Sequence, residues 1–186
     1  MRRVTAVAPP SAGMERWRLA FASAIAADGR AMLYVAGGAN EGDRRWITLP
    51  EAVRSGRPYF VRVHPAVLAV DADERDAVQR VATLAHRLTA ACLRPVIVAS
   101  GQLGRAHLFC RVGGAEMRAH AVEAATTLGL DARATIRPPL APHRLAGCSY
   151  PRQPKDWRIA LAALAVVPPR RGPLSPAMQK VLRGDK

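Results

Sequence analysis

The chain has 186 residues, with 28 lysine and arginine residues against 14 aspartate and glutamate residues, and a formal net charge of +14 at pH 7. This length suffices for one domain with a hydrophobic core, and the sequence lacks a run of 18 apolar residues, so we expect no membrane span and no membrane partner. Nearly all basic residues are arginines, whose guanidinium fork suits phosphate, so nucleic acid is the leading partner.

Cysteine usage and the N-terminus indicate a cytoplasmic location. The three cysteines are odd in number and lack CxxC spacing, which favours free thiols in a reducing compartment. No apolar run of signal-peptide length follows Arg2 and Arg3. The sequence also contains no P-loop motif and no histidine spacing typical of a zinc site.

The first third of the chain predicts mixed helix and strand. Prolines and a glycine make residues 1–13 a flexible arm. Apolar residues at helical spacing then predict a helix over 14–27. The segments that follow are predicted as a strand over 31–36, a glycine-rich charged loop over 37–45, a short helix over 50–55 and a strand over 59–63.

The central third has the clearest pattern. An apolar run after Pro65 predicts a buried strand over 66–73, and apolar residues three and four apart predict a helix over 76–92. Two strands, a second helix and a fourth strand follow, over 95–100, 106–112, 117–128 and 130–137. The order βαββαβ is that of the split βαβ plan, so we expect an α+β fold with an RRM-like sheet.

This plan makes a prediction about which residues meet. In its usual version the sheet is antiparallel, the first and third strands are central, and the fourth strand lies beside the first. The C-terminal end of the first strand then meets the N-terminal ends of the third and fourth strands. We therefore expect one edge of the sheet to bring together Asp71, Asp73, His107 and Asp131.

Residues 14–150 are expected to form one domain, in which an N-terminal αβ flank precedes the RRM-like sheet. The pattern weakens beyond residue 150. Residues 151–186 are predicted to form a basic, proline-rich tail with short helices over 157–166 and 178–183. The arginines of this tail would flank the sheet and strengthen the electrostatic attraction for nucleic acid.

The acidic residues have the chemistry of a two-metal site. Asp71 and Asp73 are two apart on a strand, so both carboxylates project from one face and repel unless a cation lies between them. Mg²⁺ or Mn²⁺ suits such oxygen ligands, and Asp131 would complete a pair of metal sites able to stabilise the attacking and leaving oxygens of phosphoryl transfer. The alternative is that these acids only end a strand and cap the next helix.

The basic residues nearby suit a nucleoside triphosphate. His107 opens a strand after a glycine-bearing turn, and Arg105 beside those glycines favours a loop that faces phosphate. A structural histidine is the alternative. The segment 136–147 is rich in proline, and we expect it to hold Arg137, His143 and Arg144 rigidly against phosphates. The alternative is an ordinary proline-rich loop.

Together these motifs resemble the archaeo-eukaryotic primase superfamily, in particular the bifunctional primase-polymerase branch of plasmids and phages. Val67–Asp73 is similar to its apolar strand ending in Asp-x-Asp or Asp-x-Glu, and Ser100–Phe109 to its glycine-containing turn that leads to a histidine. Leu130–Asp131 and Pro138–Arg144 resemble its third acidic motif and its Pro-Pro-Ser-x-His segment. The resemblance covers about residues 60–147. Arg105 and Leu140 depart from it, since the family often has serine at both positions.

The resemblance implies an enzyme that carries out template-directed nucleotidyl transfer, as a DNA primase or DNA polymerase in plasmid, phage or chromosomal replication. It implies Mg²⁺ or Mn²⁺ held by Asp71, Asp73 and Asp131, and nucleotide binding by Ser100, Arg105, His107, Arg137, His143 and Arg144. The implied partners are a single-stranded or primed DNA template, nucleoside triphosphates and a separate replicative helicase.

Two other functions remain open from the sequence. The first is a catalytically weak or inactive module with the primase fold, which binds DNA in replication initiation or helicase recruitment. The distances between the three carboxylates would distinguish it from the enzyme. The second is an RNA-binding protein, which would need exposed aromatic residues on the central strands of an RRM-like sheet. Phe109 is the only aromatic residue there, which argues against it.

Overall fold

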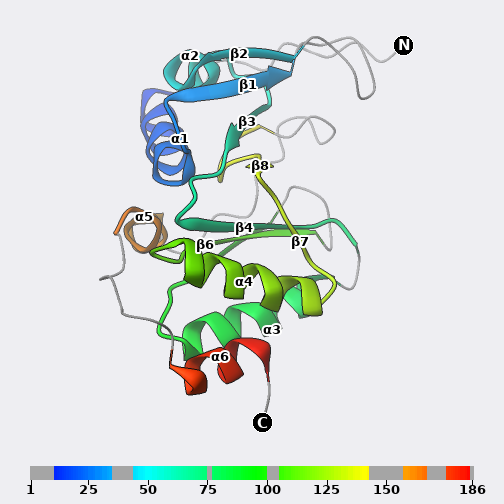
Figure 1. Ribbon diagram of the computed structural model, residues 1–186. Coiled ribbons are helices and arrows are strands. Elements are labelled where there is room, and N and C mark those ends of the chain that lie inside the picture. The colour runs from blue at the N-terminus through cyan, green and yellow to red at the C-terminus, as the bar shows by residue number, and fades with distance from the viewer. Residues whose placement is uncertain are drawn as a thin grey trace.

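The chain forms two antiparallel four-stranded sheets and six helices within residues 11–34, 44–74, 77–99, 105–142, 157–166 and 175–184, which a computed structural model describes (Figure 1). The strands are β1 (Arg30–Tyr34), β2 (Arg44–Thr48), β3 (Tyr59–Arg62), β4 (Val67–Ala72), β5 (Val96–Ala99), β6 (Ala106–Arg111), β7 (Asp131–Ala132) and β8 (Thr135–Ile136). The helices are α1 (Ala12–Ile25), α2 (Leu49–Arg54), α3 (Ala77–Ala90), α4 (Ala115–Thr127), α5 (Trp157–Ala165) and α6 (Pro176–Arg183). The expected α+β class is confirmed. Within these ranges no helix is both long and apolar enough to cross a membrane.

The first sheet has the strand order β2-β1-β3-β8, and α1 and α2 cover one of its faces (Figure 1). Local sequence explains where both helices begin. At α1 the Ser11 hydroxyl accepts a hydrogen bond from the Met14 amide. At α2 the Glu51 carboxylate accepts hydrogen bonds from the amide and the hydroxyl of Thr48, as in a capping box.

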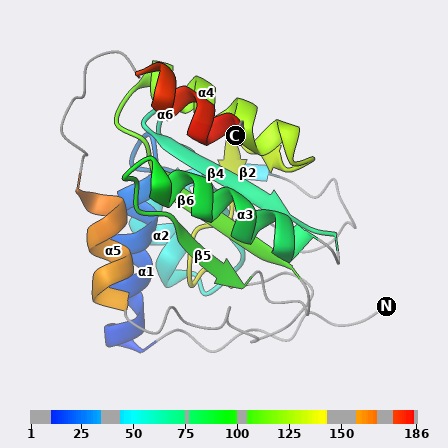
Figure 2. The same cartoon turned by 90° about the horizontal axis from the view of Figure 1, so that it is seen from below.

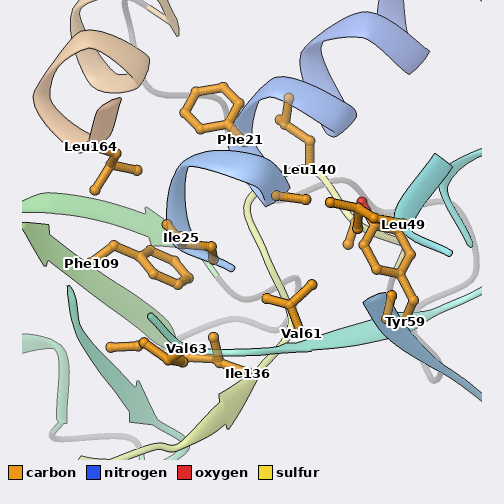
Figure 3. Packing of buried hydrophobic residues seen from close by; sticks show 14 of the residues in the cluster. Phe21, Ile25, Leu49, Tyr59, Val61, Val63, Phe109, Ile136, Leu140 and Leu164 are labelled. Atoms are coloured by element: carbon orange, nitrogen blue, oxygen red, sulfur yellow. The ribbon is translucent and has the colours of Figure 1, made fainter. Parts of the chain in front are cut away.

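One hydrophobic core joins the first sheet to the second (Figure 3). Phe21 of α1 and Tyr59 of β3 belong to this core and are fully buried. Phe109 of β6 and Leu164 of α5 pack into the same cluster, which therefore continues onto one face of the second sheet. Burial of such large apolar side chains is the main force that holds the two halves together.

The second sheet has the strand order β5-β6-β4-β7. Helices α3 and α4 cover the face away from the first sheet, where Leu68, Val70 and Leu108 form a second core. Successive residues of a strand point to opposite faces, and both faces of β4 are covered, so its sequence is apolar without alternation. Helix α6 lies over α3 and α4, and its Leu182 is fully buried in the second core (Figure 2).

Helices α3 and α4 each join two parallel strands across a third strand. β4 and β5 are parallel to each other because both are antiparallel to β6, which lies between them. In the same way β6 and β7 are parallel, with β4 between them. This interleaving puts β4 and β6 at the centre of the sheet. It also brings the C-terminal end of β4 beside the N-terminal ends of β6 and β7.

The prediction of one strand over 130–137 is wrong, because this segment forms two short strands in different sheets. β7 pairs with β4, and β8 pairs with β3. β3 and β4 are consecutive strands that themselves belong to different sheets, so a segment that runs beside both must also change sheet. The change occurs at Arg133 and Ala134, whose backbone groups still bond to Ala69 and Val63.

Two other segments differ from expectation. Arg44 and Arg45, expected in a loop, are the first residues of β2, which pairs along its whole length with β1. The C-terminal helices, expected in a tail, contribute to both cores through Leu164 of α5 and Leu182 of α6. The predicted arm falls largely in residues 1–10, outside the described residues.

Candidate functional site

Asp71 is the centre of a row of polar side chains across the second sheet. In the strand register it lies opposite His107 of β6 on one side and Asp131 of β7 on the other. Register partners project from the same face of a sheet, and here that face also carries Ala69 and Phe109 and lies away from α3 and α4. The structure thus brings together three of the residues that the sequence analysis expected to meet.

Asp71 and His107 form the most buried pair of the row. His107 Nε2 lies 3.1 Å from Asp71 Oδ1, and the imidazole ring packs edge-on against Phe109. Oδ1 is shielded from solvent, and no well-aligned hydrogen bond reaches it from the described residues. Burial by itself raises the pKa of Asp71. The close contact with His107 and the charges of Arg133 and Arg137 outweigh burial, so the pKa lies below its ordinary value.

Arg133 bridges the two carboxylates of the row. Its Nη2 lies 3.0 Å from Asp131 Oδ2, and its Nε lies 3.9 Å from Asp71 Oδ2. Neighbouring carboxylates repel each other unless a cation lies between them, and this guanidinium is that cation. The sequence analysis missed Arg133. The strand predicted over 130–137 would have placed Arg133 on the same face as Asp131, although β7 ends at Ala132 and Arg133 directly follows it.

Asp73 lies just beyond the end of β4 and has a different partner. Its Oδ1 is 3.6 Å from Nη1 of Arg105, which precedes β6. The two side chains are 55% and 38% exposed, so this ion pair contributes little to stability. Asp73 and Arg105 therefore form an outer pair beside the buried row.

Arg137 follows β8 and is a buried cation near the site. Its side chain donates a hydrogen bond from Nη1 to the carbonyl oxygen of Ala141 at 3.1 Å. Burial lowers the pKa of this guanidinium to about 10, while the negative charges of Asp71 and Asp73 act in the opposite direction. Arg137 thus adds positive charge to the site from the segment that leaves the first sheet.

The segment 137–142 after β8 is buried throughout and held from two sides. Besides the bond from Arg137, the Nε of Arg18 in α1 donates to the carbonyl oxygen of Leu140 at 3.0 Å, and Arg18 is only 1% exposed. Leu140 has a φ of 65°, in the left-handed region that favours glycine. No sequence pattern pointed to Arg18, because a buried arginine on an apolar helix face has no local signature.

Three of the nucleotide contacts expected from the sequence fall outside the part of the chain that the structure describes. Ser100, His143 and Arg144 lie outside the described residues. The glycine-bearing turn before Arg105 also lies outside them. The roles of these residues remain predictions.

The three aspartates expected to bind metal contact two different arginines. Among the described residues no group of three or more His, Cys, Asp or Glu side chains is arranged to hold a metal ion. Asp71 and Asp131 share Arg133, whereas Asp73 faces Arg105. The Asp71–Asp131 pair offers carboxylate oxygens, the ligand type that Mg²⁺ or Mn²⁺ prefers, and both carboxylates face the guanidinium of Arg133.

No family model, no curated protein and no solved structure matches this chain.

Proposed function

We propose that this chain catalyses template-directed nucleotidyl transfer, as a DNA primase or DNA polymerase in plasmid, phage or chromosomal replication. The observation that carries the proposal is the row in which Asp71 lies between His107 and Asp131. It combines two oxygen ligands for a divalent cation with a nitrogen donor for a phosphate oxygen. Such a combination suits a nucleoside triphosphate and its metal.

The strand order supports the RRM-like interpretation of the second sheet. β4 and β6 are central, β7 lies beside β4, and β5 lies beside β6. Helices α3 and α4 cover a single face, so the other face can carry the row near its edge. This strand order supports the βαββαβ plan, on which the proposed resemblance to primase-polymerases rests.

Each side chain has a proposed role. Asp71 and Asp131 would hold Mg²⁺ or Mn²⁺, and Asp73 would join them when its contact with Arg105 opens. The bound cation supplies electrostatic stabilisation of the attacking and leaving oxygens. His107 would donate a hydrogen bond to the triphosphate. Arg105 and Arg137 would supply positive charge that offsets the negative charge of the triphosphate. Ser100, His143 and Arg144 are further proposed contacts of the triphosphate.

The charge of the chain supports a nucleic-acid template. A net charge of +14 on 186 residues attracts a polyanion from a distance and favours a single-stranded or primed DNA partner. A separate replicative helicase is a further proposed partner. The described cysteines, Cys92 and Cys110, are free thiols, which suits the proposed cytoplasmic location.

One observation favours a second candidate, a DNA-binding module with the primase fold and little or no activity. Arg133 occupies the space between Asp71 and Asp131, and Arg105 faces Asp73. Internal cations can satisfy these carboxylates permanently, so that no metal binds. The chain would then bind DNA in replication initiation or helicase recruitment.

Incorporation of labelled nucleotides separates the two candidates. The purified chain is incubated with primed or unprimed single-stranded DNA, nucleoside triphosphates and Mg²⁺ or Mn²⁺, and the products are sized on a gel. We expect synthesis by the wild-type chain and a loss of about 10²-fold or more in Asp71→Asn. Glu123→Gln on α4 is the control, since this exposed acid pairs only with His120 among the described residues. DNA binding without synthesis under every condition would favour the second candidate.

A further inference from the structure

The first sheet carries a row of large apolar side chains on the face opposite α1 and α2. In the strand register Met32 of β1 lies opposite Trp46 of β2 and opposite Phe60 of β3. The residues that alternate with them point into the core instead: Ala31, Leu33, Tyr59 and Val61. Because register partners share a face, the side chains of Met32, Trp46 and Phe60 form one continuous apolar strip.

This strip is not part of the hydrophobic interior. Met32, Trp46 and Phe60 are all partly exposed, and none of them packs against either of the two buried cores. Each of these three side chains keeps a solvent-accessible part on this face of the sheet. Helices α1 and α2 pack on the opposite face, because their buried side chains share one core with Leu33, Tyr59 and Val61.

Arginine accompanies the aromatic residues. The guanidinium carbon of Arg62 lies 4.4 Å from the ring centroid of Trp46, a cation–π contact. Arg62 is 58% exposed and also makes a long ion pair of 3.7 Å with Asp28. A guanidinium stacked on an indole still presents its own outer plane and its N–H edges to solvent. Arg30 is exposed on the same face, two residues before Met32.

We propose that this face binds single-stranded nucleic acid, with a base stacked on the Arg62–Trp46 pair and phosphates near Arg30. Aromatic rings and guanidinium planes accept the flat face of any base, whereas arginine N–H groups pair with phosphate. An apolar protein segment would also fit the strip, but the stacked arginine, Arg30 and the +14 charge of the chain complement a polyanion.

The proposal concerns a different sheet from the carboxylate row. The strip lies on the first sheet, and the row lies on the second. Single-stranded binding therefore does not require the proposed nucleotidyl transfer, although a template held here would serve it.

The test measures binding of a fluorescein-labelled oligothymidylate by anisotropy, beside a duplex of the same length. Trp46→Ala removes the stacking partner of Arg62, and Arg62→Lys keeps the charge but removes the planar guanidinium. We expect each to raise the dissociation constant for the oligothymidylate about tenfold, because one stacking contact is lost. Affinity for the duplex, whose bases are already stacked, should stay unchanged. The dependence on salt should also stay unchanged in Arg62→Lys.

Matched controls make the result specific. Arg54→Ala removes an exposed charge from α2, and Ile97→Ala removes an exposed apolar side chain from β5; both should leave oligothymidylate binding nearly unchanged. A thermal melt checks that each variant is folded, and Arg62→Lys keeps the test valid if Trp46→Ala unfolds. Equal losses for oligothymidylate and duplex, or wild-type binding in Arg62→Lys, would overturn the proposal. Asp71→Asn should bind the oligothymidylate normally, so failure of nucleotidyl transfer is distinguishable from failure here.

Discussion

Asp71 and Asp131 lie opposite each other on neighbouring strands and share the guanidinium of Arg133. At neutral pH two carboxylates so placed need a cation between them. The folded chain supplies one from the residue that follows β7. A divalent metal ion would satisfy the same need, so Arg133 and a metal are competitors for one place.

Removing Arg133 should therefore strengthen metal binding. Arg133→Ala is expected to raise the affinity for Mn²⁺ by about three- to tenfold, because two partly exposed ion pairs no longer compete with it. Mn²⁺ titration followed by electron paramagnetic resonance measures the change. Arg54→Ala, at an exposed position on α2, should leave the affinity unchanged. A weaker affinity in Arg133→Ala would mean that Arg133 supports the site and does not compete for it.

The lowered pKa of Asp71 predicts how stability depends on pH. A carboxyl group whose pKa is lower in the folded state stabilises the fold above its unfolded pKa, and this stabilisation is lost as pH falls through the folded pKa. The wild-type chain should thus lose more free energy of unfolding than Asp71→Asn between neutral pH and about pH 3. Urea unfolding at both pH values measures this difference, and parallel losses in the two proteins would contradict the account.

Leu140 offers a test of the buried segment that follows β8. Leu140→Ala and Leu140→Gly should both lower the free energy of unfolding by about 2–5 kcal/mol, because each removes a fully buried side chain. Glycine should be the better replacement by about 1 kcal/mol, since it adopts the φ of 65° without strain. At Leu84, buried in α3, the order should reverse, because glycine is unfavourable within a helix. The same order at both positions in urea unfolding would argue against a strained Leu140.

Helix α6 should stabilise the fold and not only add charge. Leu182 is fully buried in the second core, and Arg87 of α3 donates hydrogen bonds to the carbonyl oxygens of Leu182 and Arg183 at the end of α6. Leu182→Ala is expected to lower the free energy of unfolding by about 2–4 kcal/mol. Val181→Ala, at a neighbouring position that is 37% exposed, should cost less than about 1 kcal/mol. Equal effects of the two changes would mean that α6 is only loosely attached.

The sequence predicted the elements from β4 to α4 well because their signals are local. The apolar run before Asp71 is buried on both faces, and the helix that follows has one apolar stripe, so composition and spacing alone locate both elements. The proximity of His107 and Asp131 to Asp71 followed from element order. These predictions needed no knowledge of side-chain packing.

The rest of the fold depended on contacts that are distant in sequence. The change of sheet between Asp131 and Ile136 follows from the neighbouring strands β3 and β4, and nothing in the segment itself marks it. Arg44 and Arg45 were expected in a charged loop, because the strand character of β2 comes from its pairing with β1. The burial of Arg18 arises only when Leu140 is brought against α1.

The most direct measurement of the central claim is Mn²⁺ binding to the folded chain in the presence of a nucleoside triphosphate. If Asp71 and Asp131 hold the metal, Asp71→Asn and Asp131→Asn should each weaken Mn²⁺ binding by about tenfold or more, because each removes a charged oxygen ligand. Glu123→Gln, an acid outside the row, should bind Mn²⁺ like the wild-type chain. Equal Mn²⁺ affinities in the wild-type chain and in all three variants would contradict the claim that this row is a metal and nucleotide site.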